Sequence, residues 1–277
     1  MAQQQLRILT ISAHPHDWTW FAGTLGIHVE MGDQATVCIV THGGRTHREA
    51  YLDELRKPEA ERNPEVLNVP IEKYTEQKEE EMRRDAAIFG VTDVRMLGYP
   101  DKPFLLQEHP QAIEDLTELI LDVQPHVLIT ECPFTDTARK MAHRTDHTEV
   151  GRAAMEAKER AQRPRDSLVS PHRIAVTFWP GDQFSHDELD FVVELSDKWF
   201  EKRVEAEACY ESQGHDESWS RRRMIVDLGK VGWAVKTNYA EGYVREHPEL
   251  LTSLPVPQPM IEQAAEGSME RIRRLSQ

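Results

Sequence analysis

Short apolar runs constrain the fold of this chain more than any other feature of its sequence. Five of them, at residues 6–12, 35–41, 94–97, 127–130 and 174–178, are rich in β-branched side chains. None shows the alternation of apolar and polar residues that is typical of a half-exposed strand. The runs therefore predict strands that are buried on both faces, as in a parallel sheet.

Helical patterns separate these runs, at residues 19–31, 72–89, 112–123 and 146–161. Gly32 and Gly90 follow the first two patterns, where a helix C-cap favours a residue with positive φ. Because strand and helix alternate, we expect an α/β, Rossmann-like fold, with a mostly parallel sheet and helices on both faces.

The remaining segments suggest one domain over residues 1–250 and an arm with a helix over 251–277. Residues 45–72 are charged and carry three prolines, which indicates a partly helical surface excursion. In the second half, short strands at 192–196 and 223–227 around a helix at 197–210 are expected to extend one edge of the sheet.

Composition excludes several partners. With 277 residues and a net charge of −15, the chain should repel nucleic acid and anionic membrane surfaces. No apolar stretch approaches the roughly 20 residues of a membrane span, and a cytoplasmic location is expected. Three widely spaced cysteines argue against a disulfide framework or a paired-cysteine metal site.

Two polar clusters stand where strands should end and helices begin. Residues 14–17 read HPHD after the first strand, and His143, Asp146 and His147 follow the fourth. If these two strands are neighbours, both clusters face one crevice at the carboxyl edge of the sheet. Two histidines and a carboxylate are the ligand set of a catalytic zinc or a non-haem iron. The simpler alternative is that Asp17 caps a helix and His14 is a packed histidine.

The two clusters also carry a resemblance to the PIG-L/LmbE-like family of zinc-dependent amide deacetylases, the family of N-acetylglucosaminylphosphatidylinositol de-N-acetylase. That family opens with Ala-His-Pro-Asp-Asp-Glu, and residues 13–18 here read AHPHDW. Its second signature, His-Pro-Asp-His followed by Val-Gly, resembles residues 144–147 (RTDH) with 150–151. Weaker similarities at residues 82–91, 97–101, 208–213 and 239–243 extend the resemblance over about 6–243.

The resemblance implies that His14, Asp17 and His147 bind Zn²⁺, with another divalent metal as the alternative. It also implies a substrate-side role for Asp101. Departures from the pattern matter as much. His16 replaces the family's general base Asp, Trp18 its Glu, Arg144 its oxyanion-side His beside His143, and Tyr210 the His of its His-x-Ser-Gln.

These departures leave two functions open. In the first, the protein deacetylates an N-acetylated amino sugar or its conjugate. His16 then acts as base or proton shuttle, Asp146 orients a histidine, and Arg144 with His143 steadies the oxyanion. In the second, His16 is a fourth ligand and the protein binds metal or carbohydrate without hydrolysis. Trp18 is a candidate for stacking on a sugar, and Tyr210 for contacting the substrate.

The terminal arm suggests assembly. Apolar residues recur near helical spacing over 261–275, in a stripe too modest to fold alone. The stripe docks either on another subunit or back on its own domain. The family resemblance favours a homo-oligomer, a trimer or hexamer.

Overall fold

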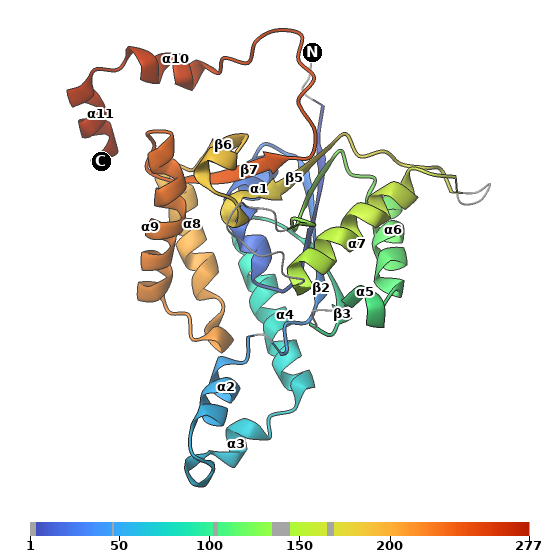
Figure 1. Ribbon diagram of the computed structural model, residues 1–277. Coiled ribbons are helices and arrows are strands. Elements are labelled where there is room, and N and C mark those ends of the chain that lie inside the picture. Colours follow the sequence, from blue (N-terminus) through green and yellow to red (C-terminus); the bar gives the residue numbers. More distant parts are fainter. Residues whose placement is uncertain (1–3, 46, 102–104, 135–144, 165–168, 277) are drawn as a thin grey trace.

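A seven-stranded sheet forms the centre of the computed structural model, which describes residues 4–276 apart from 46, 102–104, 135–144 and 165–168 (Figure 1). Its strands are β1 (Arg7–Ser12), β2 (Gln34–Thr41), β3 (Asp93–Tyr99), β4 (Val127–Thr130), β5 (Val176–Pro180), β6 (Phe191–Glu194) and β7 (Ala240–Arg245). They lie in the order β3-β2-β1-β4-β5-β7-β6. The first five run parallel, and β7 is antiparallel to both neighbours, which confirms the mostly parallel sheet.

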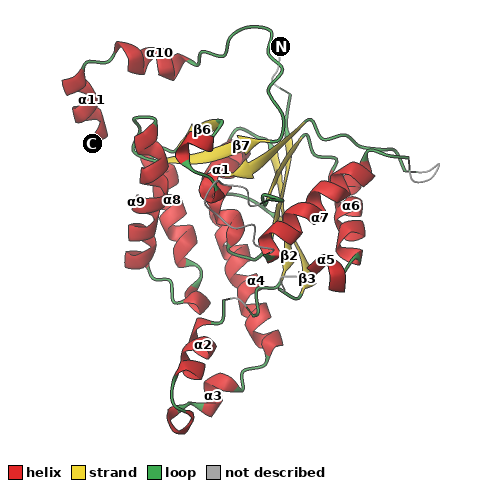
Figure 2. Ribbon diagram, viewed as in Figure 1, coloured by secondary structure: helices red, strands yellow, loops and turns green. Residues whose placement is uncertain are grey.

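Helices cover both faces of this sheet (Figure 2). They are α1 (Ala22–Glu30), α2 (Glu49–Arg56), α3 (Pro64–Leu67), α4 (Ile71–Ile88), α5 (Leu105–Glu108), α6 (Gln111–Val123), α7 (Asp146–Ala161), α8 (Asp197–Ala208), α9 (Glu217–Ala234), α10 (Gln258–Ala265) and α11 (Ser268–Leu275). One core lies between the sheet and α1, α4, α8 and α9, and the other lies beneath α5, α6 and α7. The predicted Rossmann-like architecture is therefore confirmed.

Two glycines end helices as the sequence predicts. Gly32 follows α1 with φ 94°, and Gly90 follows α4 with φ 76°. Glycine adopts this left-handed conformation without the steric cost that a Cβ atom brings. Each turn leads directly into the next strand, so the alternation of helix and strand is set locally.

The strand predicted at 223–227 is wrong, because these residues lie inside α9. Met224 and Leu228 are buried, and Ser220 and Gly232 extend the same stripe at a spacing of four. Ile225 and Val226 are exposed, so the apolar run at residues 224–226 resembles a buried strand in sequence only.

Two segments project from the body. The excursion after β2 forms a lobe of α2 and α3 at the foot of α4, and the arm with α10 and α11 lies at the opposite end (Figure 1). Most apolar side chains of the arm, including Met260, Met269 and Ile272, are exposed. Of the helices that the structure describes, none combines the length and apolarity needed to cross a bilayer.

Candidate metal centre

The turn after β1 folds back on its own carboxylate. The Asp17 Oδ2 atom accepts a hydrogen bond from the His14 backbone N–H at 2.8 Å and lies 2.9 Å from His14 Nδ1. The short 3₁₀ helix η1 (Asp17–Phe21) has no side-chain cap. The interpretation of Asp17 as a helix cap is therefore wrong, and its carboxylate is part of a histidine cluster.

The second cluster reaches the same place because β1 and β4 are neighbours. Thr145 caps α7 with a capping box, which fixes the helix start at Asp146. Gly151, one turn further on, allows α7 to approach the end of β4: a Cβ there would lie 2.5 Å from the Glu131 carbonyl oxygen. Local sequence thus places His147 opposite His14.

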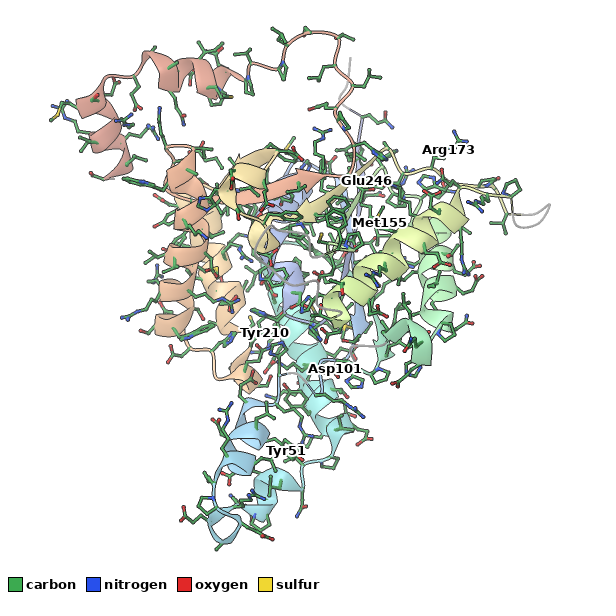
Figure 3. All side chains as sticks on the ribbon, viewed as in Figure 1. Tyr51, Asp101, Met155, Arg173, Tyr210 and Glu246 are labelled. Atoms are coloured by element: carbon green, nitrogen blue, oxygen red, sulfur yellow. The ribbon has the colours of Figure 1, made fainter. Side chains whose placement is uncertain are left out.

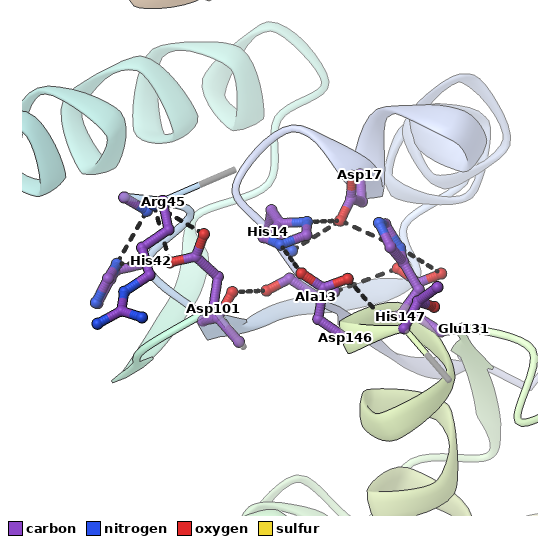
Figure 4. Close-up of polar contacts among 12 residues, drawn as sticks. Ala13, His14, Asp17, His42, Arg45, Asp101, Glu131, Asp146 and His147 are labelled. Atoms are coloured by element: carbon purple, nitrogen blue, oxygen red, sulfur yellow. Dashed lines mark hydrogen bonds and ion pairs between the residues drawn. The ribbon is translucent and has the colours of Figure 1, made fainter. Parts of the chain in front are cut away.

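His14, Asp17 and His147 come together at this edge, with one ligand atom from each residue all within 4.8 Å of one another (Figure 4). His147 Nδ1 lies 3.6 Å from Asp17 Oδ2. The two imidazole rings meet edge to face at 4.9 Å between centroids. These are the three residues that the family resemblance implies as metal ligands.

Asp146 supports this group from the side. Its Oδ2 lies 2.9 Å from His14 Nε2, and its Oδ1 accepts the His147 backbone N–H at 3.1 Å. A carboxylate on the far nitrogen of a histidine fixes the tautomer and orientation of the ring, an arrangement common around metal ions. The orienting role expected of Asp146 requires such a contact and stays a prediction.

The charges around the two histidines favour a cation. Burial lowers the pKa of His14, but Asp17 and Asp146 outweigh it and raise that pKa to about 9. Burial likewise opposes the protonation of His147, but Asp17 and Glu131 raise its pKa to about 10. The same imidazoles hold the pKa of the buried Asp17 carboxyl below its usual range. Without a metal ion, protons supply the positive charge that these carboxylates require.

The residues present fit a divalent metal ion. Imidazole nitrogens and carboxylate oxygens are ordinary ligands of zinc and iron. Within the described part of the chain, the buried Nδ1 atom of His147 makes no hydrogen bond of normal length, and it faces the Asp17 and Glu131 carboxylates at 3.6 and 3.4 Å.

Sequence reasoning missed Glu131, which directly follows β4. Its side chain is 2% exposed, and its Oε1 atom accepts the Ala13 backbone N–H at 3.2 Å. Its Oε2 atom lies 3.4 Å from His147 Nδ1. The available signal was a charged residue immediately after a fully apolar strand at the carboxyl edge of the sheet.

His16 faces away from this group. Its Nε2 atom lies 3.0 Å from both carboxylate oxygens of Glu207 on α8, in a second cluster with His215. Glu207 also binds Arg223 at 2.8 Å. Burial raises the pKa of Glu207, but His16 and Arg223 outweigh it and lower that pKa to about 2. Both roles expected of His16, as a base or as a fourth ligand, require it to lie beside the candidate ligands. The structure does not place it there.

Tyr210, which follows α8 (Figure 3), and Trp18 are both buried. The Tyr210 hydroxyl lies 2.6 Å from the Pro15 carbonyl oxygen and 2.7 Å from Asp85 Oδ2. Trp18 packs edge-on against Phe89. Neither side chain is accessible to a substrate, which argues against the binding roles expected of them.

Other aromatic residues lie at the candidate ligands. Trp20 stacks on the His147 ring at 5.8 Å between centroids, and the ring of His47 meets that of His14 at 5.4 Å. Trp20 is partly exposed, so it is the tryptophan that can meet a bound molecule.

Asp101 anchors the loop after β2. Its two carboxylate oxygens accept the Arg45 backbone N–H at 3.1 and 2.8 Å, and His42 Nδ1 lies 3.4 Å away (Figure 4). Asp101, two residues after β3, therefore lies at the same edge of the sheet as the candidate ligands. The predicted residues His143 and Arg144 lie outside the described residues.

A curated relative matches almost the whole chain. It is the 1D-myo-inositol 2-acetamido-2-deoxy-alpha-D-glucopyranoside deacetylase of Corynebacterium glutamicum, 24% identical over 91% of this chain and 93% of the relative.

Solved structures share the fold. The N,N'-diacetylchitobiose deacetylase of Pyrococcus horikoshii superposes with a TM-score of 0.67, at 19% identity, over 86% of this chain and 82% of its own. The 4-carboxy-2-hydroxymuconate hydratase of Pseudomonas putida gives the same TM-score and identity over 90% and 99%.

A family model identifies the lineage. The model described as PIG-L, GlcNAc-PI de-N-acetylase, matches residues 9–158, which is more than half of the chain. The matched segment begins within β1 and contains β2, β3, β4 and all three candidate ligands. The chain belongs to the PIG-L family.

Proposed function

We propose that this protein is a metal-dependent hydrolase of an N-acyl amide, and that it deacetylates an N-acetylated amino sugar or its conjugate. The observation that carries the proposal is the convergence of His14, Asp17 and His147 at the ends of β1 and β4. Membership of the PIG-L family and the names of the deacetylase relatives support the substrate class.

A divalent metal, zinc in the first instance, would be held by His14, Asp17 and His147 and would polarise the acyl carbonyl and activate the attacking water. Asp146 orients His14 through Nε2 and holds the first turn of α7 in place. Trp20 offers an aromatic face beside His147 for the sugar ring.

We assign His16 a positioning role. Its Nε2 atom contacts Glu207, and a base must reach the proton that it accepts. Together with the contact of Tyr210 to Pro15, the pair of His16 and Glu207 holds the turn from behind. The His14 and Asp17 side chains then lie on the face toward His147.

Acetate release from a panel of N-acetylglucosamine conjugates, with zinc added to metal-depleted protein, tests the proposal. We expect turnover that a chelator abolishes and zinc restores. Because the fold also occurs in a hydratase, free amine should be measured beside acetate. Metal binding without release of either product would contradict hydrolysis.

A binding role is the second candidate, because position 16 carries no carboxylate and its imidazole is held by Glu207. Under this alternative, the protein binds N-acetylated sugars with metal present and leaves them intact. Calorimetry with the same panel separates the two functions, since binding without turnover supports only the second.

We further propose a homo-oligomer assembled through the arm. The apolar side chains of α10 and α11, Ile261 and Met269 among them, are exposed on their own subunit. Arg274 pairs with Glu266 inside the arm and donates to the Lys236 carbonyl oxygen after α9, so the stripe is presented in an ordered form.

A further inference from the structure

We propose that Glu131 is a fourth metal ligand, so that this chain holds its metal with two histidines and two carboxylates. The inference rests on the proposed metal site and adds a residue that the family's three-ligand pattern does not contain. It is carried by the position of Glu131 and by the spacing of the donor atoms around His147.

Glu131 is built into the site from the strand next to β1. It directly follows β4, its side chain is almost completely buried, and the Ala13 backbone N–H holds its Oε1 atom. That contact leaves Oε2 on the side of His147. The close packing of Gly151 on the Glu131 backbone keeps this strand end against α7.

The two distances from His147 Nδ1 to its neighbouring carboxylates match the edge of a coordination tetrahedron. Ligand atoms about 2.1 Å from a tetrahedral zinc ion lie about 3.4 Å from one another. His147 Nδ1 lies 3.4 Å from Glu131 Oε2 and 3.6 Å from Asp17 Oδ2, and Asp17 Oδ2 lies 2.9 Å from His14 Nδ1. His147 Nδ1 thus stands between two carboxylates, one that follows β1 and one that follows β4.

Charge leads to the same assignment. Histidine binds a metal as the neutral imidazole, so Asp17 alone would leave a divalent ion with one uncompensated positive charge in a buried place. Glu131 supplies the second negative charge. Asp146 faces the far nitrogen of His14 and therefore acts on the ligand rather than on the ion.

Zinc titration of three proteins tests the proposal: the wild type, Glu131→Gln and Asp182→Asn. Glutamine keeps an oxygen acceptor for the Ala13 N–H. Asp182 follows β5 and interacts electrostatically with Glu131 and His147, so Asp182→Asn changes a neighbouring carboxyl group without removing a proposed ligand. We expect Glu131→Gln to raise the Kd for zinc by more than about 100-fold, beyond the 10–100-fold typical of residues behind the ligands. The Asp182→Asn change should be at least ten times smaller.

The visible absorption of the Co²⁺-substituted proteins gives an independent readout. It should change in Glu131→Gln and stay unchanged in Asp182→Asn. Equal zinc affinities and spectra for the wild type and Glu131→Gln would overturn the assignment of Glu131 while leaving the metal site intact. A wild type that binds no zinc would overturn the proposed function as well.

If Glu131→Gln does not fold, the zinc-loaded wild-type crystal structure decides. Glu131 Oε2 within about 2.2 Å of the ion supports the proposal. A water molecule in that position, with Glu131 turned away, refutes it.

Discussion

His14 and His16 stand two positions apart in one turn, yet their surroundings differ. His14 lies between Asp17 of η1 and Asp146 of α7, and these carboxylates outweigh burial and raise its pKa to about 9. His16 lies against Glu207, which Arg223 already neutralises. The comparison teaches that a candidate metal site and a polar cluster with its own arginine can share one turn, and that the arginine at Glu207 distinguishes the two.

Removal of a ligand on the His14 side should have the largest effect. We expect His147→Ala to lower kcat/KM by on the order of a thousand-fold or more, because metal catalysis contributes several kcal/mol to transition-state stabilisation. Zinc stoichiometry and acetate release measure the effect. His28→Ala is the matched control, since it removes a carboxylate-paired histidine outside the site. Unchanged zinc binding in His147→Ala would contradict the ligand assignment.

The pH dependence of zinc binding should be the next largest effect. The pKa values of about 9 for His14 and about 10 for His147 mean that both imidazoles are protonated at pH 7 without metal. Binding must then release two protons, so the Kd should fall about 100-fold per pH unit between pH 7 and 9 and level off above pH 10. Calorimetry in buffers of different ionisation enthalpy counts the protons. A count near zero at pH 7 would show that the histidines are already neutral.

The same two pKa values affect the stability of the metal-free protein. Both lie above the unfolded value of 6.5, so their stabilising contribution is complete below pH 6.5 and is lost as pH rises through about 9 to 10. The contribution of Glu207, with a pKa lowered to about 2, is complete above its unfolded value of 4.5 and is lost as pH falls through 2. The two sides of the turn thus weaken at opposite ends of the pH scale.

Disruption of the His16 side should reduce stability more than metal affinity. We expect Glu207→Gln to lower the free energy of unfolding by about 2–3 kcal/mol. The substitution removes the buried negative charge that contacts both His16 and Arg223. The difference from wild type, followed by urea unfolding, should narrow below pH 4.5. The control Glu201→Gln is also on α8 and breaks an exposed pair with Arg221 of α9, so it should cost less than about 1 kcal/mol. If Glu207→Gln lowered the free energy of zinc binding by more than the free energy of unfolding, Glu207 would belong to the metal site.

Removal of the arm should change neither the contacts of His14 nor those of His16. Truncation after Leu250 is expected to leave zinc affinity unchanged and to reduce the particle mass to that of a monomer, because the exposed apolar stripe of α10 and α11 is lost. Light scattering on the full chain and the truncated chain measures this. An unchanged mass in a folded truncated protein would exclude the arm as the contact between subunits.

The sequence predicted those features that depend on local patterns. The strands at the centre of the sheet followed from their apolar runs, and the two polar clusters followed from the strand ends. The direction of His16 could not be predicted, since it depends on Glu207, 191 positions away. The role of Glu131 could not be predicted either, because it belongs to no sequence motif and depends on its contact with His147 on a neighbouring element. The strand predicted at 223–227 was wrong because three consecutive apolar residues are compatible with a buried strand and with one face of a helix.

The distance along the chain between partners also orders their assembly during synthesis. His14 leaves the ribosome 132 residues before Asp146, an interval of roughly ten seconds at typical elongation rates. Glu207 follows later still, 191 positions after His16. A nascent chain can therefore gather every candidate ligand while the rear of the turn still lacks its partner. An ion captured at that stage would hold the turn in place until α8 arrives.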